Sequence, residues 1–384
     1  MARKPVSASL FNVGMNRRDL LRRSAMMAGG ALALGGAGSL LAACGGDPTK
    51  AAQGGEPAVS GGGGSNKKVV VADWGGAIQD AEKTYLYEPF TKETGIEVVI
   101  SGPPSDAKIK AMVDSGNVEW DLVAGSKSNV LSLGSEYFEE FPERLHSIKG
   151  MDPAFTDKQA IAYYVFSTNI GWNAETLNGK KMENWADFFD TSTFPGKRTM
   201  GGIEGGGNPE LEFALLADGV ARDKLYPLDV DRAFKKMEEI KGSVPQWWSS
   251  GSQPGQMLVS KQVAAASIWS GRVFTLQGEK APIDFTWNDG MYTPAAWIIP
   301  KGAQNKDAAI QLAEYSVQPE VQARLWGNYP CGPTNSLALA KMDEEWAIKL
   351  PTHPDHAAVQ FINNAEWWGE NRDMVFKRWN EFSL

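Results

Sequence analysis

The chain has 384 residues, of which 42% are hydrophobic and 22% charged, a composition typical of a folded globular protein. A single hydrophobic core stops growing near about 250–300 residues, so this length predicts two lobes. The formal net charge of −8 excludes a protein that attracts nucleic acid by its overall charge. Two cysteines and three histidines exclude a multi-disulfide scaffold and leave little for a histidine-built metal site, so we expect neither metal nor cofactor.

The first 43 residues have the pattern of an export signal. The pair Arg17-Arg18 resembles a twin-arginine motif, and the uncharged stretch 25–43 leads to the lipobox-like LAAC at 41–44. We predict a signal peptide over 1–43, a lipidated Cys44 and a flexible Gly- and Ser-rich linker to residue 66. A membrane-spanning helix is the alternative interpretation of the uncharged stretch. The signal interpretation predicts an exported protein held by its lipid at the outer face of the cytoplasmic membrane.

After the linker, strand-like and helix-like patterns alternate. We predict a strand at 69–72, a helix at 75–94 stopped by Gly95, a strand at 96–100, a helix at 106–115 stopped by Gly116 and a strand at 121–124. Strands joined by helical crossovers run parallel, so this part is expected to be a doubly wound α/β sheet. In such sheets ligands bind beyond the carboxyl ends of the strands.

The second half of the chain shows the same alternation of helix-like and strand-like patterns, less clearly, and this indicates a second α/β lobe. Helices are predicted at 210–221, 230–241 and 253–260, followed by a strand at 263–269 and an apolar run at 295–300. Asn305 is expected to cap one helix and Pro319 to open another, before a break at 329–333.

Motifs that carry enzyme chemistry are missing from the sequence. It has no nucleophile elbow, phosphate loop, zinc-binding HExxH or dinucleotide-binding glycine fingerprint. His353 and His356 lie in a loop-like stretch, and Cys331 is expected to be a buried, unreactive thiol. We therefore predict no catalytic residues and a binding protein rather than an enzyme.

Short stretches, in a fixed order over nearly the whole exported part, resemble the spermidine/putrescine-binding protein family of ABC importers. They are ADWGG at 72–76, FTKETGI at 90–96, WDLV at 120–123, LYPLD at 225–229, WWSSG at 247–251, IWSGR at 268–272, APID at 281–284, PKGA at 300–303, EWW at 366–368 and WNE at 379–381.

The resemblance implies the type II periplasmic-binding fold, with two lobes, each a doubly wound and mainly parallel sheet with helices on both faces, and a ligand cleft between them. The lobes are expected at 67–168 plus 294–336 and at 169–293 plus 337–384, with hinge crossings near 167–171, 292–295 and 331–335. The implied partners are a small amine, taken as spermidine or putrescine, and the membrane permease that receives it. A monomer is expected.

The same resemblance assigns ligand-binding residues. The family's ligand aromatics fall on Trp74, Trp269 and Tyr329, whose ring faces attract cations, and Ser126 is a further candidate. For each aromatic residue, core packing is the alternative. The acids that pair with amines in the family fall on Gly206, Pro209 and Ala295, and one more aromatic falls on Ser128. Nearby acids that replace the missing ones are Asp73, Glu204 and Asp289, for which an exposed or capping role is the alternative.

Other residues indicate a ligand with an anionic end. Gly75-Gly76 and Gly205-Gly206-Gly207 precede predicted helices, whose free N–H groups favour carboxylates, and Arg272 follows Trp269 by three residues. Arg272 is a candidate carboxylate clamp, with a structural salt bridge as the alternative. An ω-amino acid such as 4-aminobutyrate, or another small amino acid, is therefore the second ligand class. An exported enzyme on the same fold is the third alternative.

Overall fold

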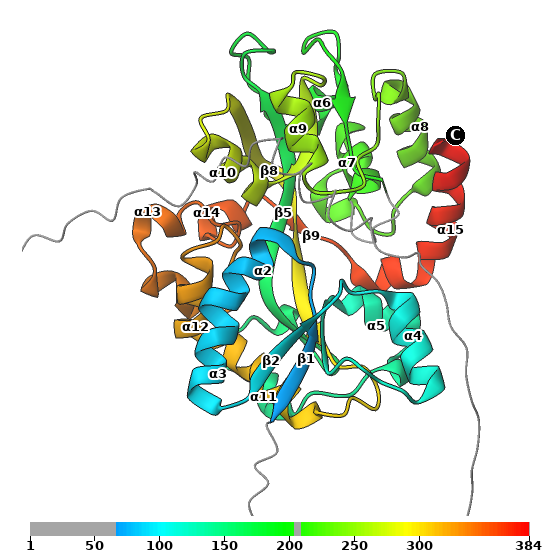
Figure 1. The fold of residues 1–384 in the computed structure, drawn as a ribbon. Coiled ribbons are helices and arrows are strands. Elements are labelled where there is room, and N and C mark those ends of the chain that lie inside the picture. Colours follow the sequence, from blue (N-terminus) through cyan, green and yellow to red (C-terminus); the bar gives the residue numbers. More distant parts are fainter. Residues whose placement is uncertain (1–66, 203–208, 384) are drawn as a thin grey trace, which may run out of the picture. The chain divides into compact units, whose positions relative to one another are not determined.

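A computed structural model describes residues 67–202 and 209–383, which belong to one compact unit (Figure 1). The predicted signal peptide, Cys44, the linker, Glu204 and Gly206 lie outside the described residues. Within the described ranges, no helix combines the length and the apolar character that crossing a membrane requires.

The first predicted elements are confirmed almost to the residue. Gly95 and Gly116 adopt the left-handed conformation that ends the second and third of these helices, and Ser105 caps the third through the Lys108 amide. One π-helical segment, Lys83–Tyr87, joins the first two helices into the single helix expected at 75–94. In chain order the elements are β1 (Lys68–Ala72), α2 (Gly76–Glu82), α3 (Glu88–Thr94), β2 (Glu97–Ser101), α4 (Asp106–Ser115), β3 (Leu122–Gly125) and α5 (Lys127–Leu133).

The rest of the chain contains long strands that the sequence patterns did not delimit. The largest differences are β5, β8 and the last helix, whereas the other predicted helices appear with small shifts at their ends. The elements are β4 (Thr156–Asp157), β5 (Ala160–Asn173), α6 (Trp185–Phe189), β6 (Arg198–Thr199), α7 (Glu210–Ala217), α8 (Val230–Lys241), α9 (Gln253–Val259), β7 (Ala265–Trp269), α10 (Ser270–Gly278), β8 (Ile283–Ile298), α11 (Lys306–Ser316), α12 (Pro319–Trp326), α13 (Glu344–Ala347), α14 (Pro354–Ala357), β9 (Phe361–Ile362) and α15 (Ala365–Ser383).

The strands form one mixed sheet in the order β2-β1-β3-β8-β5-β7-β6. The pairs β1–β2, β1–β3 and β6–β7 are parallel, as expected, whereas β5 and β8 are antiparallel to each other and to β7 and β3, respectively. The α/β class is therefore confirmed, but hydrogen bonds join the strands of both lobes. This happens because β5 and β8, with 14 and 16 residues, run through both (Figure 1).

The buried side chains form four clusters, which combine into two groups along these long strands. One group combines β1, β3, α3, α4, α11 and α12 with the part of β5 up to Phe166 and the part of β8 from Ala295. The other combines α6 to α9, β7 and α15 with β5 from Ile170 and β8 up to Met291. The pairing register of β5 with β8 is irregular between Thr168 and Ile170, which lie between the two groups. We call them the first and second core.

The helix α15 contacts both cores. Its first half faces α5, where Lys127 pairs with Glu366 at 2.6 Å and a Cβ atom on Gly369 would lie 2.8 Å from Leu131 Cβ. Glycine permits this close approach of helix and side chain. In its second half Trp379 and Phe382 are buried in the second core. A movement of one core against the other therefore has to be accommodated along α15.

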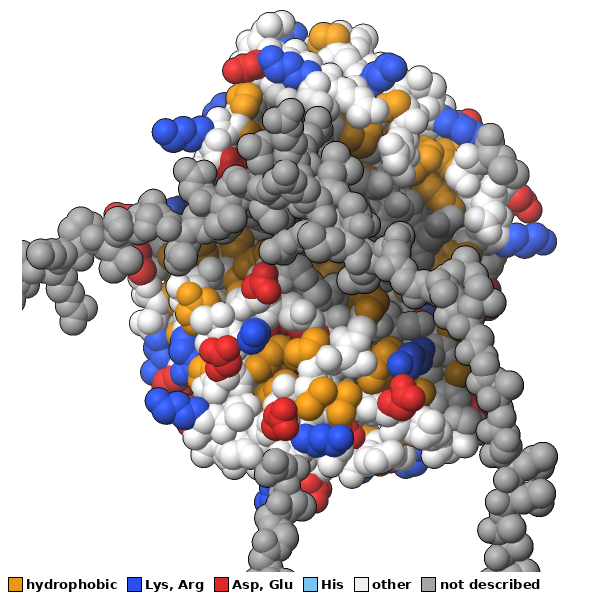
Figure 2. Space-filling model, viewed as in Figure 1, with side chains coloured by type: hydrophobic (Ala, Val, Ile, Leu, Met, Phe, Trp, Pro, Cys, Tyr) orange, Lys and Arg blue, Asp and Glu red, His pale blue; other side chains and the backbone are white. Residues whose placement is uncertain are grey.

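Charges of both signs are interspersed on the described surface. Figure 2 shows acidic and basic side chains alternating with apolar ones over the part of this face that carries α2, β2 and α4. This part of the face has no continuous basic stripe of the kind that tracks a phosphate backbone.

Candidate functional site

Three of the predicted site residues follow strands that end at the same edge of the sheet. Asp73 and Trp74 come directly after β1, and Ser126 comes directly after β3. The parallel register pairs Ala72 with Val123, so Trp74 and Ser126 lie at neighbouring strand ends. The Trp74 ring is 55% exposed and Ser126 is half-buried, with its hydroxyl 2.7 Å from Asn129 Oδ1. Core packing is therefore excluded as the role of Trp74.

Asp73 belongs to a buried polar network behind this edge. Its carboxylate accepts the Trp74 amide at 2.6 Å and the Tyr87 hydroxyl at 3.0 Å, and Tyr163 donates to Glu82 Oε1 at 2.9 Å. Burial, followed by the charge of Asp73, raises the pKa of Glu82 well above its ordinary value. Both oxygens of Asp73 thus already have donors within the protein.

Trp269, at the end of β7, lies in an aromatic cluster with Phe166 and Trp248. Its ring centroid is 5.6 Å from that of Phe166 and 5.9 Å from that of Trp248, both in edge-to-face geometry. The ring also covers Gly251, where a Cβ atom would approach to 2.2 Å. These contacts fix the orientation of the Trp269 ring, while its indole N–H has no partner among the described residues.

Arg272 lies in the first turn of α10, beside Tyr329 and Cys331. A Cβ atom on the adjacent Gly271 would lie 3.3 Å from the carbonyl oxygen of Pro330, so the start of α10 touches the 329–331 segment. Burial raises the pKa of Tyr329, and the Arg272 charge opposes that rise. Among the described residues no side-chain hydrogen bond or ion pair holds Arg272, so the alternative of a structural salt bridge has no support within them.

Cys331 is a free, buried thiol, as predicted, with 5% exposure. Burial, followed by the charge of Glu82, raises the pKa of its thiol, whereas Arg272 lowers it. Glu82 and Arg272 thus act on the same thiol from the first and the second core. Glu82 behind β1 and Arg272 of α10 are therefore both close enough to Cys331 to change the pKa of its thiol.

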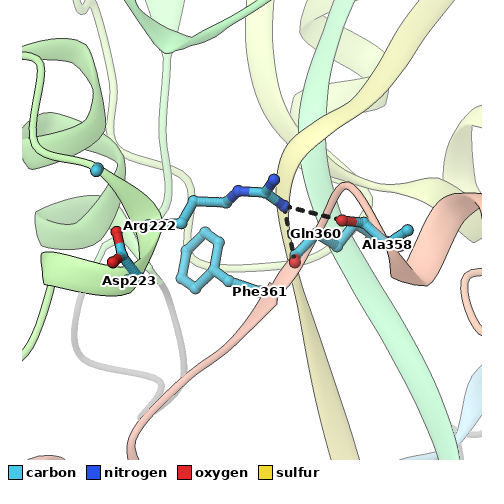
Figure 3. Close-up of a pocket in the computed structure, with 6 residues that line it drawn as sticks. Arg222, Asp223, Ala358, Gln360 and Phe361 are labelled. Atoms are coloured by element: carbon cyan, nitrogen blue, oxygen red, sulfur yellow. Dashed lines mark hydrogen bonds between the residues drawn. The ribbon is translucent and has the colours of Figure 1, made fainter.

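Asp289 has a different set of contacts. Its carboxylate lies 3.2 Å from Arg222 Nε, and its backbone is held by Val359 and Trp185. Arg222 also donates to the carbonyl oxygens of Ala358 and Gln360, at the edge of a surface hollow of about 550 Å³ (Figure 3). Burial raises the pKa of Asp289 and the Arg222 charge lowers it. Asp289 is thus an acid with a protein cation as its partner.

Glu210 is a buried acid that the sequence analysis did not single out. Its Oε1 accepts the Gly201 amide at 2.8 Å and the Ser267 hydroxyl at 3.1 Å, whereas its Oε2 has no partner among the described residues. Burial raises its pKa to about 8. It is the first residue of α7, and acidic residues are common at helix starts, so the sequence alone did not mark it as a ligand-binding residue. The sequence signal that could have identified Glu210 is its position next to Pro209, onto which an amine-pairing acid of the family falls.

The structure therefore groups some of the predicted residues and not others. Trp269 and Arg272 lie at the junction of β7 and α10, and Arg272 is close to Tyr329, whereas Asp73 bonds to Tyr87 and Asp289 pairs with Arg222. Of the positions matched to missing family groups, Pro209 and Ala295 are buried and Ser128 lies in α5.

Comparisons with known proteins agree with this architecture. A model of the bacterial extracellular solute-binding protein family matches residues 85–354. A gamma-aminobutyric acid-binding protein of Pseudomonas aeruginosa is 32% identical over 325 residues, which cover 82% of this chain and 91% of that protein. A spermidine/putrescine-binding periplasmic protein of Escherichia coli is 26% identical over 298 residues, covering 73% and 82%. The solved structure of a GABA receptor superposes with a TM-score of 0.77 at 34% identity, covering 83% of this chain and 98% of that one.

The chain belongs to the bacterial extracellular solute-binding protein family. This confirms the resemblance seen in the sequence, the two-lobed fold class and the prediction of a binding protein rather than an enzyme.

Proposed function

We propose that this solute-binding protein captures an ω-amino acid of the 4-aminobutyrate type and delivers it to an ABC permease. The observation that carries the proposal is Arg272, a half-buried cation without a protein anion in the described residues, beside Tyr329 and the first turn of α10. A guanidinium in this state is a strong binding group for a carboxylate. The relatives named for gamma-aminobutyric acid support the same ligand class.

A polyamine, the ligand first implied by the resemblance, fits these residues less well. It carries ammonium groups only, so it requires carboxylates near its ends and no free cation close by. The family acids are replaced by Pro209 and Ala295, and Arg272 adds a positive charge. An ω-amino acid instead places its carboxylate on Arg272 and its methylenes against Trp269 and Tyr329, with the ammonium at the aromatic side.

Binding assays of the purified protein from residue 45 onward test this proposal. By calorimetry, 4-aminobutyrate is expected to bind, and spermidine and putrescine are expected to bind at least about 100-fold more weakly. At 100 times its dissociation constant a true ligand adds about 2.7 kcal/mol to the free energy of unfolding, which a thermal melt detects. Tight binding of a polyamine without binding of 4-aminobutyrate would contradict the proposal.

Capture is proposed to occur by closure of the two lobes, 67–168 plus 294–336 and 169–293 plus 337–384. The division of the buried side chains along β5 and β8 supports the boundaries near 168 and 294, as does the irregular register at Thr168–Ile170. The boundary at 336 lacks this support, because Met342 packs against the first core and Trp346 donates to the Trp326 carbonyl of α12. Small-angle scattering is expected to show a smaller radius of gyration when saturating 4-aminobutyrate is added. An unchanged radius, with binding verified in the same sample, would rule out closure from an open state.

Anchoring through lipidated Cys44 is also proposed, on the basis of the LAAC motif at 41–44. A lipid chain with a polar linker holds a domain at a membrane while it works in water. In a cell that processes lipoproteins, the wild-type protein is expected in the membrane fraction and the Cys44→Ser variant in the soluble fraction. Equal partitioning of the two proteins would refute anchoring at Cys44.

A further inference from the structure

One face of β7 brings together polar groups that the sequence analysis did not connect. Thr168 of β5 pairs with Trp269 of β7 in the antiparallel register, so their side chains share a face of the sheet. Ser267, two residues before Trp269, lies on the same face. Its hydroxyl donates to Glu210, which places this carboxylate beside the strand that ends in Trp269.

Three buried polar atoms at this face have no partner among the described residues. They are Glu210 Oε2, Thr168 Oγ1 and the indole nitrogen of Trp269. Glu210 and Thr168 are 0% exposed. A buried polar atom without a hydrogen bond is costly, so three on one face indicate that a bound molecule completes them.

The other buried or nominated acids have their partners elsewhere in the protein. Both oxygens of Asp73 accept hydrogen bonds, Glu82 accepts from Tyr163, and Asp289 pairs with Arg222. Glu212 is two residues from Glu210 on α7, about 200° around the helix, and its Oε1 accepts from Tyr226 and Trp368, away from β7. Its Oε2, like that of Glu210, has no partner among the described residues. Glu210 is therefore the described acid whose open oxygen lies on the face of Trp269.

We infer that Glu210 accepts a hydrogen bond from the ligand's ammonium group and thereby selects an ω-amino acid over a simple carboxylate. This rests on the proposed function, in which Arg272 holds the other end. Ser267 and Trp269 are separated by about 7 Å along the strand, and Arg272 follows in the first turn of α10. An acid and a base at the two ends of this short stretch match a ligand whose opposite charges are separated by a few methylene groups.

Ligand binding is then coupled to ionisation of the Glu210 carboxyl group. Burial raises its pKa to about 8 in the free protein. The groups that contact it are the Gly201 amide and the Ser267 hydroxyl. The buried carboxyl of Glu212, on the other side of α7, adds a smaller raising effect, and burial raises its own pKa as well. Because an ammonium group pairs with the ionised form, affinity for 4-aminobutyrate is expected to rise by about 10-fold per pH unit below pH 8.

The test compares wild type, Glu210→Gln and the control Glu212→Gln by calorimetry with 4-aminobutyrate and with butyrate, which lacks the ammonium group. Glu210→Gln is expected to bind 4-aminobutyrate about 10- to 100-fold more weakly, which is the usual worth of a charge-assisted hydrogen bond, and to lose the pH dependence. Its butyrate affinity is expected to equal that of wild type. Glu212→Gln is expected to retain the affinity for both ligands and the pH dependence of 4-aminobutyrate binding.

Each other outcome has a distinct meaning. If wild type binds 4-aminobutyrate and Glu210→Gln binds it equally well, the assignment of Glu210 is wrong and the proposed function stands. A parallel loss of butyrate affinity would also overturn the assignment, because it would reveal a general structural role. If wild type does not bind 4-aminobutyrate, the proposed function fails and the assignment with it. If Glu210→Gln does not fold, the wild-type protein still provides a test. An affinity for 4-aminobutyrate that does not change between pH 6 and 8 would overturn the assignment of Glu210.

Discussion

Replacing Arg272 by glutamine is expected to weaken binding of 4-aminobutyrate by about 100- to 1000-fold. The guanidinium is half-buried and lies near Tyr329 and Cys331, where a ligand carboxylate would be largely removed from water. A desolvated charge pair that loses one partner costs roughly 3–5 kcal/mol, and glutamine recovers a part of this through a neutral hydrogen bond. Arg272→Lys keeps the charge but lacks the two-pronged geometry, so an intermediate loss is expected. Calorimetry with each purified variant gives these numbers.

Arg324→Gln is the matched control for this experiment. Arg324 is also half-buried, but its guanidinium already donates to the Tyr85 carbonyl at 2.9 Å and to the Tyr315 hydroxyl at 3.0 Å. Its loss is expected to lower stability and to leave affinity unchanged. Butylamine, which has no carboxylate, should bind Arg272→Gln no worse than wild type. A dissociation constant for 4-aminobutyrate within about threefold of wild type would eliminate Arg272 as the carboxylate group.

The N-terminal part of the fold could be predicted closely because its signals are local. Gly95 and Gly116 stop helices through their own backbone conformation, and Ser105 caps α4 from the adjacent position. The β-branched run at 69–72 is followed by a helix, which predicts the parallel pairing that β1 makes with β2 and β3. None of these features requires knowledge of distant residues.

The long strands depend on distant partners, and their extent could not be predicted. β5 has buried side chains on both faces for most of its length, so it shows no alternation of polar and apolar residues. β8 continues through the polar stretch 284–290 because β5 supplies hydrogen bonds to residues 283–286 and, after an irregularity, from Met291 onward. Asn305 illustrates the same limit: it stands at the start of α11, but its side chain bonds to Asp121 instead of capping the helix.

The aromatic part of the candidate site followed from the resemblance, whereas its acids could not be assigned from sequence. Trp269 and Tyr329 lie at element ends beside Arg272, as strand-end ligand binding requires. Proximity in sequence favoured Asp73 and Asp289. Whether a carboxylate is free to bind a ligand depends, however, on partners from other elements, such as Tyr87 for Asp73 and Arg222 for Asp289. Glu210 becomes a candidate only when Ser267, 57 residues away, is seen beside it.

A second large effect is expected at Arg198, which organises the turn between α6 and β6. Its side chain is 0% exposed and donates to three backbone carbonyl oxygens, those of Phe188 at 2.7 Å, Gly196 at 2.8 Å and Phe194 at 2.6 Å. The Phe188 carbonyl lies in the last turn of α6, where carbonyl groups lack helical partners and attract a cation. Burial lowers the pKa of Arg198 to about 10, so it is still charged at neutral pH.

Arg198→Met keeps most of the side-chain volume and leaves these three carbonyl groups without donors. The free energy of unfolding is expected to fall by about 3–5 kcal/mol, measured by urea denaturation at pH 7. Arg232→Met is the control, because Arg232 pairs with Asp218 at the surface and such pairs contribute about 1 kcal/mol or less. Since β6 leads directly to Gly201, whose amide donates to Glu210, ligand affinity is expected to fall as well. A loss below about 1 kcal/mol at Arg198 would mean that the turn finds other donors and that its geometry does not depend on this side chain.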